Sequence, residues 1–150
     1  MTPIEQGLRR FLYLGALAVG LGVPAELLLA EHTGSAVQLV PFVLCGLLVA
    51  AVGAAWGAPS RGSVRAAAGV AALVGVGAAF GAWEHLEHNF AFAAEIDASM
   101  PVSGLVVEAL FGASPPLAPG ALAVGGALLF AATWRHPSLG AKGADANQRA

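Results

Sequence analysis

Four long apolar runs, separated by polar connections, dominate this 150-residue chain. They cover residues 8–30, 36–57, 64–83 and 117–134, and a helix needs about 20 apolar residues to cross a bilayer core. None of the runs alternates between apolar and polar residues as a membrane barrel strand does. The pattern therefore predicts an all-α integral membrane protein, built as a four-helix transmembrane bundle whose partner is the lipid bilayer.

Composition supports the same fold class. Hydrophobic residues make up 57% of the chain and charged residues only 11%, whereas soluble domains average about 25% charged. We expect one domain over residues 1–136, followed by a disordered cytoplasmic tail over residues 137–150. No basic stripe of the kind that binds nucleic acid is present, so a nucleic-acid partner is excluded.

The basic residues all fall on one side of this arrangement. Under the positive-inside rule that side faces the cytoplasm, which places both termini there. The abundance of Ala, Gly, Val and Arg suggests a GC-rich bacterial genome, and hence a bacterial inner (plasma) membrane. The basic residues are Arg9, Arg10, Arg61, Arg65, Arg135, Lys142 and Arg149.

The opposite side carries most of the acids and histidines, with no Lys or Arg. Carboxylates gathered near a low-dielectric boundary without a basic partner must either keep their protons or bind a cation. The acids are Glu26, Glu31, Glu84, Glu87, Glu95, Asp97 and Glu108, and the histidines are His32, His85 and His88.

Candidate metal ligands lie at the outer ends of the first and third runs. Glu84, His85 and His88 share one arc of a helix, because residues three or four apart are neighbours on its surface. If that helix continues, Glu95 returns to the same arc about three turns further on. The first run ends at the same membrane depth with an acid and an imidazole of its own. The predicted metal ligands are Glu26, His32, Glu84, His85, His88 and Glu95.

Imidazole with carboxylate is a ligand set for Zn²⁺, Mn²⁺, ferrous iron or Cu²⁺. Cu⁺ would prefer sulfur ligands, and Cys45 does not cluster with the two methionines. The sequence argues against haem, because the histidines lie at helix ends and few aromatic residues are available to wall a porphyrin. It also lacks the His-x-x-Glu-His motif of one zinc protease class, since residues 85–88 are one residue too short.

The sequence leaves three functions open. The first is an extracytoplasmic divalent-metal site used in metal acquisition, sensing or delivery. The second is a structural or accessory subunit of a larger membrane complex, or a homo-oligomer, whose acids meet a partner's basic patch. The third is a membrane metalloenzyme with a metal-activated water, although no nucleophile motif supports catalysis. Transport is disfavoured, because runs two to four carry no acid or base at mid-depth.

Four local features give further expectations. The apolar residues of the loop at 87–116 predict one or two short interfacial helices that lie on the outer leaflet or cap the bundle, where the loop would act as a lid over a metal site. Gly77 and Gly81 form a GxxxG motif, which marks a close helix crossing either with a second copy or within the bundle. We expect Gln38 to cap the second helix, with a hydrogen bond to a metal ligand as the alternative. Pro24 predicts a kink in the first span.

Overall fold

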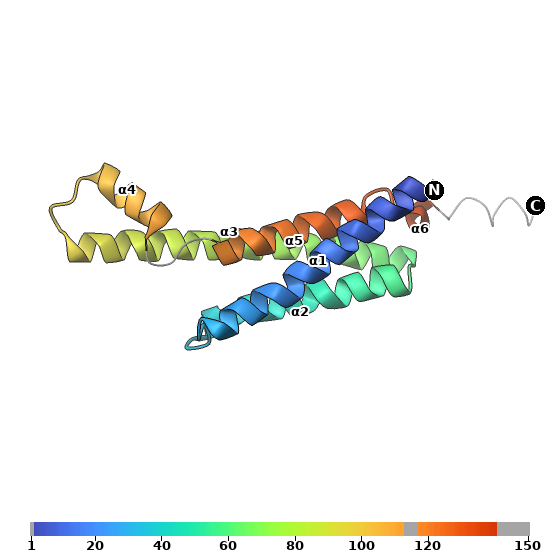
Figure 1. The fold of residues 1–150 in the computed structure, drawn as a ribbon, viewed down its shortest axis with the longest axis horizontal. Helices are drawn as coiled ribbons and strands as arrows, with labels where there is room; N and C mark the ends of the chain where they lie inside the picture. Colours follow the sequence, from blue (N-terminus) through green and yellow to red (C-terminus); the bar gives the residue numbers. More distant parts are fainter. Residues whose placement is uncertain (1, 113–116, 141–150) are drawn as a thin grey trace, which may run out of the picture.

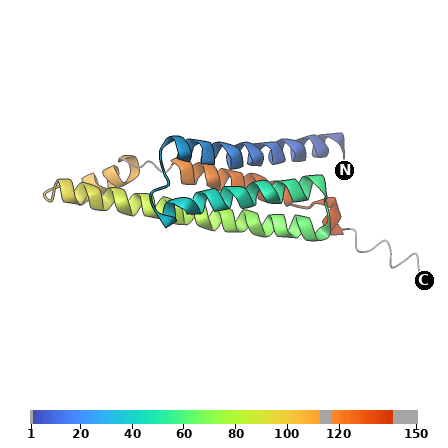
Figure 2. The same cartoon turned by 90° about the horizontal axis from the view of Figure 1, so that it is seen from below.

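The computed structural model describes residues 2–112 and 117–140, and within these ranges it consists of helices and short turns without a strand. Long helices lie side by side in a bundle, and a helical arm projects from one end (Figure 1 and Figure 2). The helices are α1 (Pro3–Leu29), α2 (Ala36–Gly57), α3 (Arg61–Ile96), α4 (Val102–Phe111), α5 (Leu117–Thr133) and α6 (Pro137–Gly140).

The bundle is an up-and-down arrangement with a closed ring of neighbours. Helix α1 packs against α2 and α5, helix α3 packs against the same two helices from the other side, and α2 also touches α5. The start of α1 and the end of α5 therefore lie together, at what we call the basic end because Arg9, Arg10, Arg61 and Arg135 belong to it. The turn between α1 and α2 lies at the other end, which we call the histidine end.

Three helices are long and apolar enough to cross a membrane, namely α1, α2 and α3. Helix α5 is equally apolar but has 17 residues, which at 1.5 Å per residue extend about 26 Å against a hydrocarbon core of about 30 Å. The expectation of membrane-spanning helices is thus supported for three of the four predicted spans. The fourth span stays a prediction.

Capping boxes fix where the first three helices begin. In each box, the hydroxyl of the residue before the helix accepts a hydrogen bond from the backbone N–H of the residue three positions later. The side chain of that later residue in turn accepts the backbone N–H of the capping residue. The expected capping role of Gln38 is confirmed, because its amide oxygen accepts the backbone N–H groups of Gly34 and Ser35. The three pairs are Thr2–Glu5, Ser35–Gln38 and Ser60–Ser63.

Glycines let the bundle helices approach closely at the core. A methyl group added at Gly125 of α5 would lie 2.7 Å from Cγ1 of Val19 in α1 and 3.0 Å from Cδ2 of Leu48 in α2. Real side chains almost never come so near, and close-packed interiors have little room to yield. Gly125 therefore marks the point where three helices meet.

The Gly77–Gly81 motif packs inside this chain. A methyl group at Gly77 would collide with the side chain of Leu44 in α2, and one at Gly81 would lie 3.4 Å from Cβ of Pro119 in α5. Both glycines thus face neighbouring helices of the same bundle. Of the two interpretations of the motif, packing within the bundle is the one the structure supports.

Helix α3 continues past the predicted end of its span. It runs to Ile96 instead of ending near residue 83, so the first part of the expected loop at 87–116 is helical. Residues 84–96, which we call the α3 extension, add about 20 Å at 1.5 Å per residue. Helix α4 folds back along this extension and, among the described helices, contacts α3 alone (Figure 1). Of the two expected positions, capping of the bundle is therefore wrong for α4, which lies beside α3, while a position on the outer leaflet stays a prediction.

The tail also differs from the expectation at its start. Residues Pro137–Gly140 form the short helix α6, which contacts α3. The rest of the tail that we expected to be disordered, residues 141–150, lies outside the described residues.

Candidate metal centre

A left-handed turn at the end of α1 positions His32. The N–H of His32 donates to the carbonyl of Leu27 at 2.9 Å, and the N–H of Glu31 donates to that of Leu28 at 3.1 Å. These two bonds form the Schellman motif, which commonly ends helices. The final N–H donor here is His32, and in this motif the residue just before that donor has a left-handed backbone conformation. Glu31 occupies that position with φ 52°, although glycine is the residue that favours it. The turn fixes where the backbone of His32 leaves the helix.

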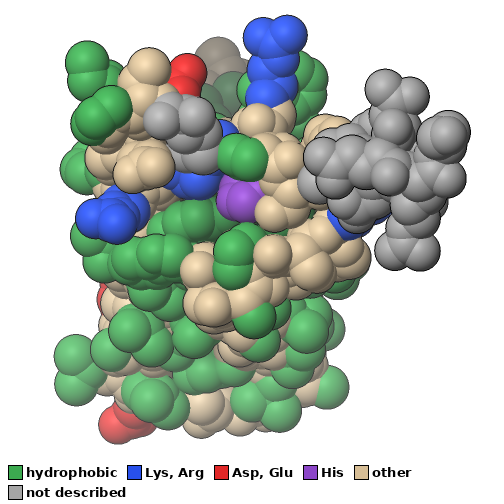
Figure 3. Space-filling view, turned by 90° about the vertical axis from the view of Figure 1, so that its right-hand side faces the viewer, with side chains coloured by type: hydrophobic (Ala, Val, Ile, Leu, Met, Phe, Trp, Pro, Cys, Tyr) green, Lys and Arg blue, Asp and Glu red, His purple; other side chains and the backbone are tan. Residues whose placement is uncertain are grey.

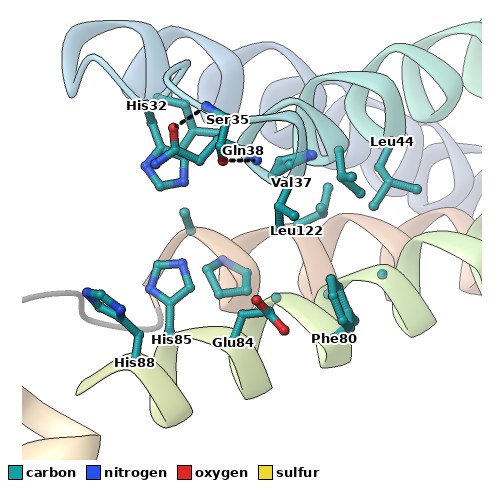
Figure 4. A pocket seen from close by; sticks show the side chains of 18 residues that line it. His32, Ser35, Val37, Gln38, Leu44, Phe80, Glu84, His85, His88 and Leu122 are labelled. Carbon is teal, nitrogen blue, oxygen red and sulfur yellow. Dashed lines mark hydrogen bonds between the residues drawn. The ribbon is translucent and has the colours of Figure 1, made fainter. Parts of the chain in front are cut away.

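His32 faces His85 across the mouth of a pocket at the histidine end. Their ring centroids are 6.3 Å apart and their planes are inclined by 29°. Figure 4 shows the two imidazoles approaching from opposite sides, His32 from the α1–α2 turn and His85 from α3. Because α1 and α3 are not direct neighbours in the bundle, this pair bridges the open end of the helix ring.

The pocket beneath the two rings has a volume of about 400 Å³. Its rim is polar and its floor is apolar, and no Lys or Arg is among the described residues that line it. The rim residues are His32, Ser35, Gln38, Glu84, His85 and His88, and the floor includes Leu44, Phe80 and Leu122.

Four of the six predicted ligands line this pocket, namely His32, Glu84, His85 and His88. Glu26 and Glu95 are exposed and do not line it.

The two outer rim groups differ in how they are held. Glu84 is half-buried, whereas His88 is exposed. The imidazole of His88 stacks on Phe92 one turn further along α3, with centroids 6.4 Å apart and planes inclined by 11°. We did not expect this contact, although the spacing of four residues in the sequence was a signal for it.

The side chains are not already gathered as a metal centre. Within residues 2–112 and 117–140, no group of three His, Cys, Asp or Glu side chains could hold a metal ion as placed. The ring centroids of His32 and His85 lie 6.3 Å apart, whereas two Zn–N bonds of about 2.0–2.1 Å at a tetrahedral angle would separate them by roughly 5 Å. The two rings would therefore have to move together by about 1 Å to share a zinc ion. A third ligand would have to come from rotation of Glu84 or His88, which lie on the same rim.

Comparison with known proteins adds nothing to this geometry: no known protein family, curated protein or solved structure matches this chain.

Proposed function

We propose that this chain is a four-span protein of a bacterial inner membrane that binds a divalent cation at the extracytoplasmic end of its bundle. The observation that carries the proposal is the approach of His32 and His85, whose ring centroids lie 6.3 Å apart over the pocket. Zn²⁺ is the first candidate among the divalent metals, because it accepts mixed imidazole and carboxylate ligands and water in one tetrahedral site.

The topology of the proposal follows from charge. The basic residues that the structure describes lie at or near the ends of helices at the basic end, as the positive-inside rule requires of a cytoplasmic face. With α5 as the fourth span, the histidine end then faces outward. Carboxylates concentrated there without a Lys or Arg lower the electrostatic potential, which raises the local concentration of cations.

Two further groups complete the proposed coordination. Rotation of Glu84 brings a carboxylate toward the His32–His85 pair, and His88 offers a third imidazole once it leaves Phe92. The apolar floor below them, with Leu44 and Leu122, carries no ligand that would lead an ion inward. We therefore propose capture, sensing or delivery of the metal at the outer face in preference to transport.

Zinc binding to the purified protein tests this proposal. Equilibrium dialysis of the detergent-solubilised chain against Zn²⁺, read by elemental analysis, should give about one ion per chain. His32→Ala and His85→Ala should each weaken binding at least tenfold, because loss of even an outer-shell partner costs about 10–100-fold. His136→Ala is the matched control, since His136 lies at the basic end, and it should bind like the parent protein. Equal binding by all four proteins, or none by the parent, would contradict the proposal.

One observation favours a second candidate, an accessory subunit of a larger complex. The α3 extension and α4 carry large apolar side chains that nothing in the described chain covers, including Ile96 at 70% exposure and Phe111 at 80%. An apolar surface held beyond the bundle is suited to contact with another membrane protein. A stoichiometric partner that co-purifies from native membranes, and is lost in an Ile96→Ser/Phe111→Ser variant, would favour this candidate.

A further inference from the structure

A second hollow lies at the basic end, far from the histidines. It has a volume of about 270 Å³ and is formed between the start of α1, the end of α2 and the residues that follow α5. Figure 3 looks onto this end and shows Arg side chains on it. We call this hollow the basic cleft, and its polar and aromatic lining comprises Gln6, Arg9, Arg10, Tyr13, Trp56 and His136.

Two hydrogen-bond donors of the basic cleft are buried without an acceptor among the described residues. The side chain of Tyr13 is 2% exposed, and its hydroxyl has no hydrogen-bond partner. Nε of Arg9 is likewise buried and unpaired. Buried polar groups are nearly always satisfied in native proteins, so two orphaned donors in one cleft point to an acceptor that belongs there.

The same arginine is held in place from the opposite side. One terminal nitrogen of Arg9 donates to the carbonyl of Ala132, and it lies 3.5 Å from the carbonyl of Trp134 at the end of α5. The guanidinium is thereby anchored to the last turn of α5, while its Nε stays buried without an acceptor among the described residues. Arg10 is exposed next to it and supplies a second guanidinium. No carboxylate is among the described residues that line the cleft.

We propose that the basic cleft binds a phosphate group. Its oxygens would accept hydrogen bonds from the guanidinium groups of Arg9 and Arg10, for which the planar arginine fork is well matched, and from the hydroxyl of Tyr13. The ring of Tyr13 stacks on Trp56 with centroids 5.8 Å apart and planes inclined by 12°. This gives the site an aromatic wall at the level where Trp and Tyr meet the membrane interface.

The phosphate can come from a phospholipid headgroup of the inner leaflet or from free phosphate. Basic pockets between membrane helices on the cytoplasmic side are the usual sites for anionic headgroups. The site is independent of the proposed metal centre, because the two pockets share no residue. Failure of one proposal therefore leaves the other standing.

Lipid retention by the delipidated protein tests the inference. Native mass spectrometry during titration with phosphatidylglycerol should show one tightly held lipid per chain. Arg10→Gln should weaken its binding about tenfold, and Tyr13→Phe, which removes only a hydroxyl, about threefold or more. Arg65→Gln removes the same charge from the same end without touching the cleft, and it should change binding less than twofold. Arg9 is left intact because its substitution would also uncap α5.

A parallel titration with inorganic phosphate separates the two sources. Binding of inorganic phosphate that Arg10→Gln weakens, with no specific lipid retained, would assign the cleft to free phosphate and still support the inference. Equal loss of lipid in Arg10→Gln and Arg65→Gln, or full retention of both ligands in Arg10→Gln and Tyr13→Phe, would overturn it.

Discussion

The side-chain amide of Asn89 in α3 donates a hydrogen bond of 3.1 Å to the backbone carbonyl of Ala109 in α4. Asn89 is only 3% exposed and is one of two buried polar residues of the described chain, the other being Thr133. This bond joins the α3 extension to α4 at a point where the arm has left the bundle. Because α4 contacts no other described helix, its position depends on this one surface of α3.

Replacement of Asn89 should release α4 from the arm. Asn89→Ala leaves the carbonyl of Ala109 buried without its partner, which costs about 1–3 kcal/mol. Amide hydrogen exchange should accelerate over Val102–Phe111 and stay unchanged in the bundle helices. Glu87→Ala, an exposed change on the same helix, should leave exchange in α4 as it is. Uniform acceleration in all helices would show that α4 is not a separate unit.

Replacement of Gly125 in α5 should destabilise the protein, because α1 and α2 both pack closely against this glycine. Gly125→Ala forces a methyl group against Val19 and Leu48, and overpacking of this kind costs about 1–3 kcal/mol. Gly120→Ala is the matched change, since a methyl group there meets nothing within 4 Å, and alanine should favour the helix by about 0.5–1 kcal/mol. Thermal unfolding in detergent should move in opposite directions for the two variants. The same shift of the melting temperature in both variants would show that the close approach at Gly125 does not limit the stability of the protein.

The sequence predicted the bundle well and the arm poorly, for a physical reason. Long apolar runs specify spans because the bilayer allows few alternatives, and the start of α2 at Ala36 is where the run predicted it. The end of α3 is not set by apolarity, since the helix continues through Glu, His and Asn. Packing against α4 and the Asn89 bond support those turns, and neither was visible in the sequence.

The sequence predicted how far along their helices the site residues lie, but not which face of each helix turns toward the pocket. Counting residues placed His32 and His85 at one depth, and the structure brings them together. Glu26 lies near the same end of α1 but is exposed beside the buried Leu27, because one residue turns a helix by about 100°. Apolar runs that are hydrophobic all round do not reveal which face turns inward. Position along the helix alone therefore could not separate Glu26 from the residues of the pocket.

Glycine at position 31 should stabilise the protein. Glu31 has φ 52° in the turn that ends α1, and a left-handed non-glycine residue costs about 1–2 kcal/mol. Glu31→Gly removes that strain and should raise the melting temperature. Glu31→Ala removes the charge but keeps the Cβ atom, so it should lack the gain. Equal stabilisation by both variants would assign the effect to the carboxylate charge instead of the backbone.

Stability should fall at mildly acidic pH because of His136. Burial, and then the charge of Arg9, lower the pKa of His136 below its usual range. The unfolded chain, with an ordinary histidine pKa of about 6.5, therefore takes up a proton before the folded chain does. The stabilisation is present above about pH 6.5 and is lost as the pH falls toward the lower pKa of the folded state, since stability rises with pH wherever the unfolded state binds more protons.

His136→Asn isolates this contribution to the pH dependence. The backbone N–H of Ser138 donates to Nδ1 of His136 at 3.2 Å, and the asparagine oxygen can accept the same bond without titrating. Melting temperatures measured from pH 7.5 to pH 5 should fall more steeply for the parent protein than for His136→Asn. His88→Asn serves as the comparison, because His88 is exposed at the other end, and it should keep the parent slope. If His136→Asn instead kept the parent slope and His88→Asn flattened it, the acid sensitivity would belong to the histidine end.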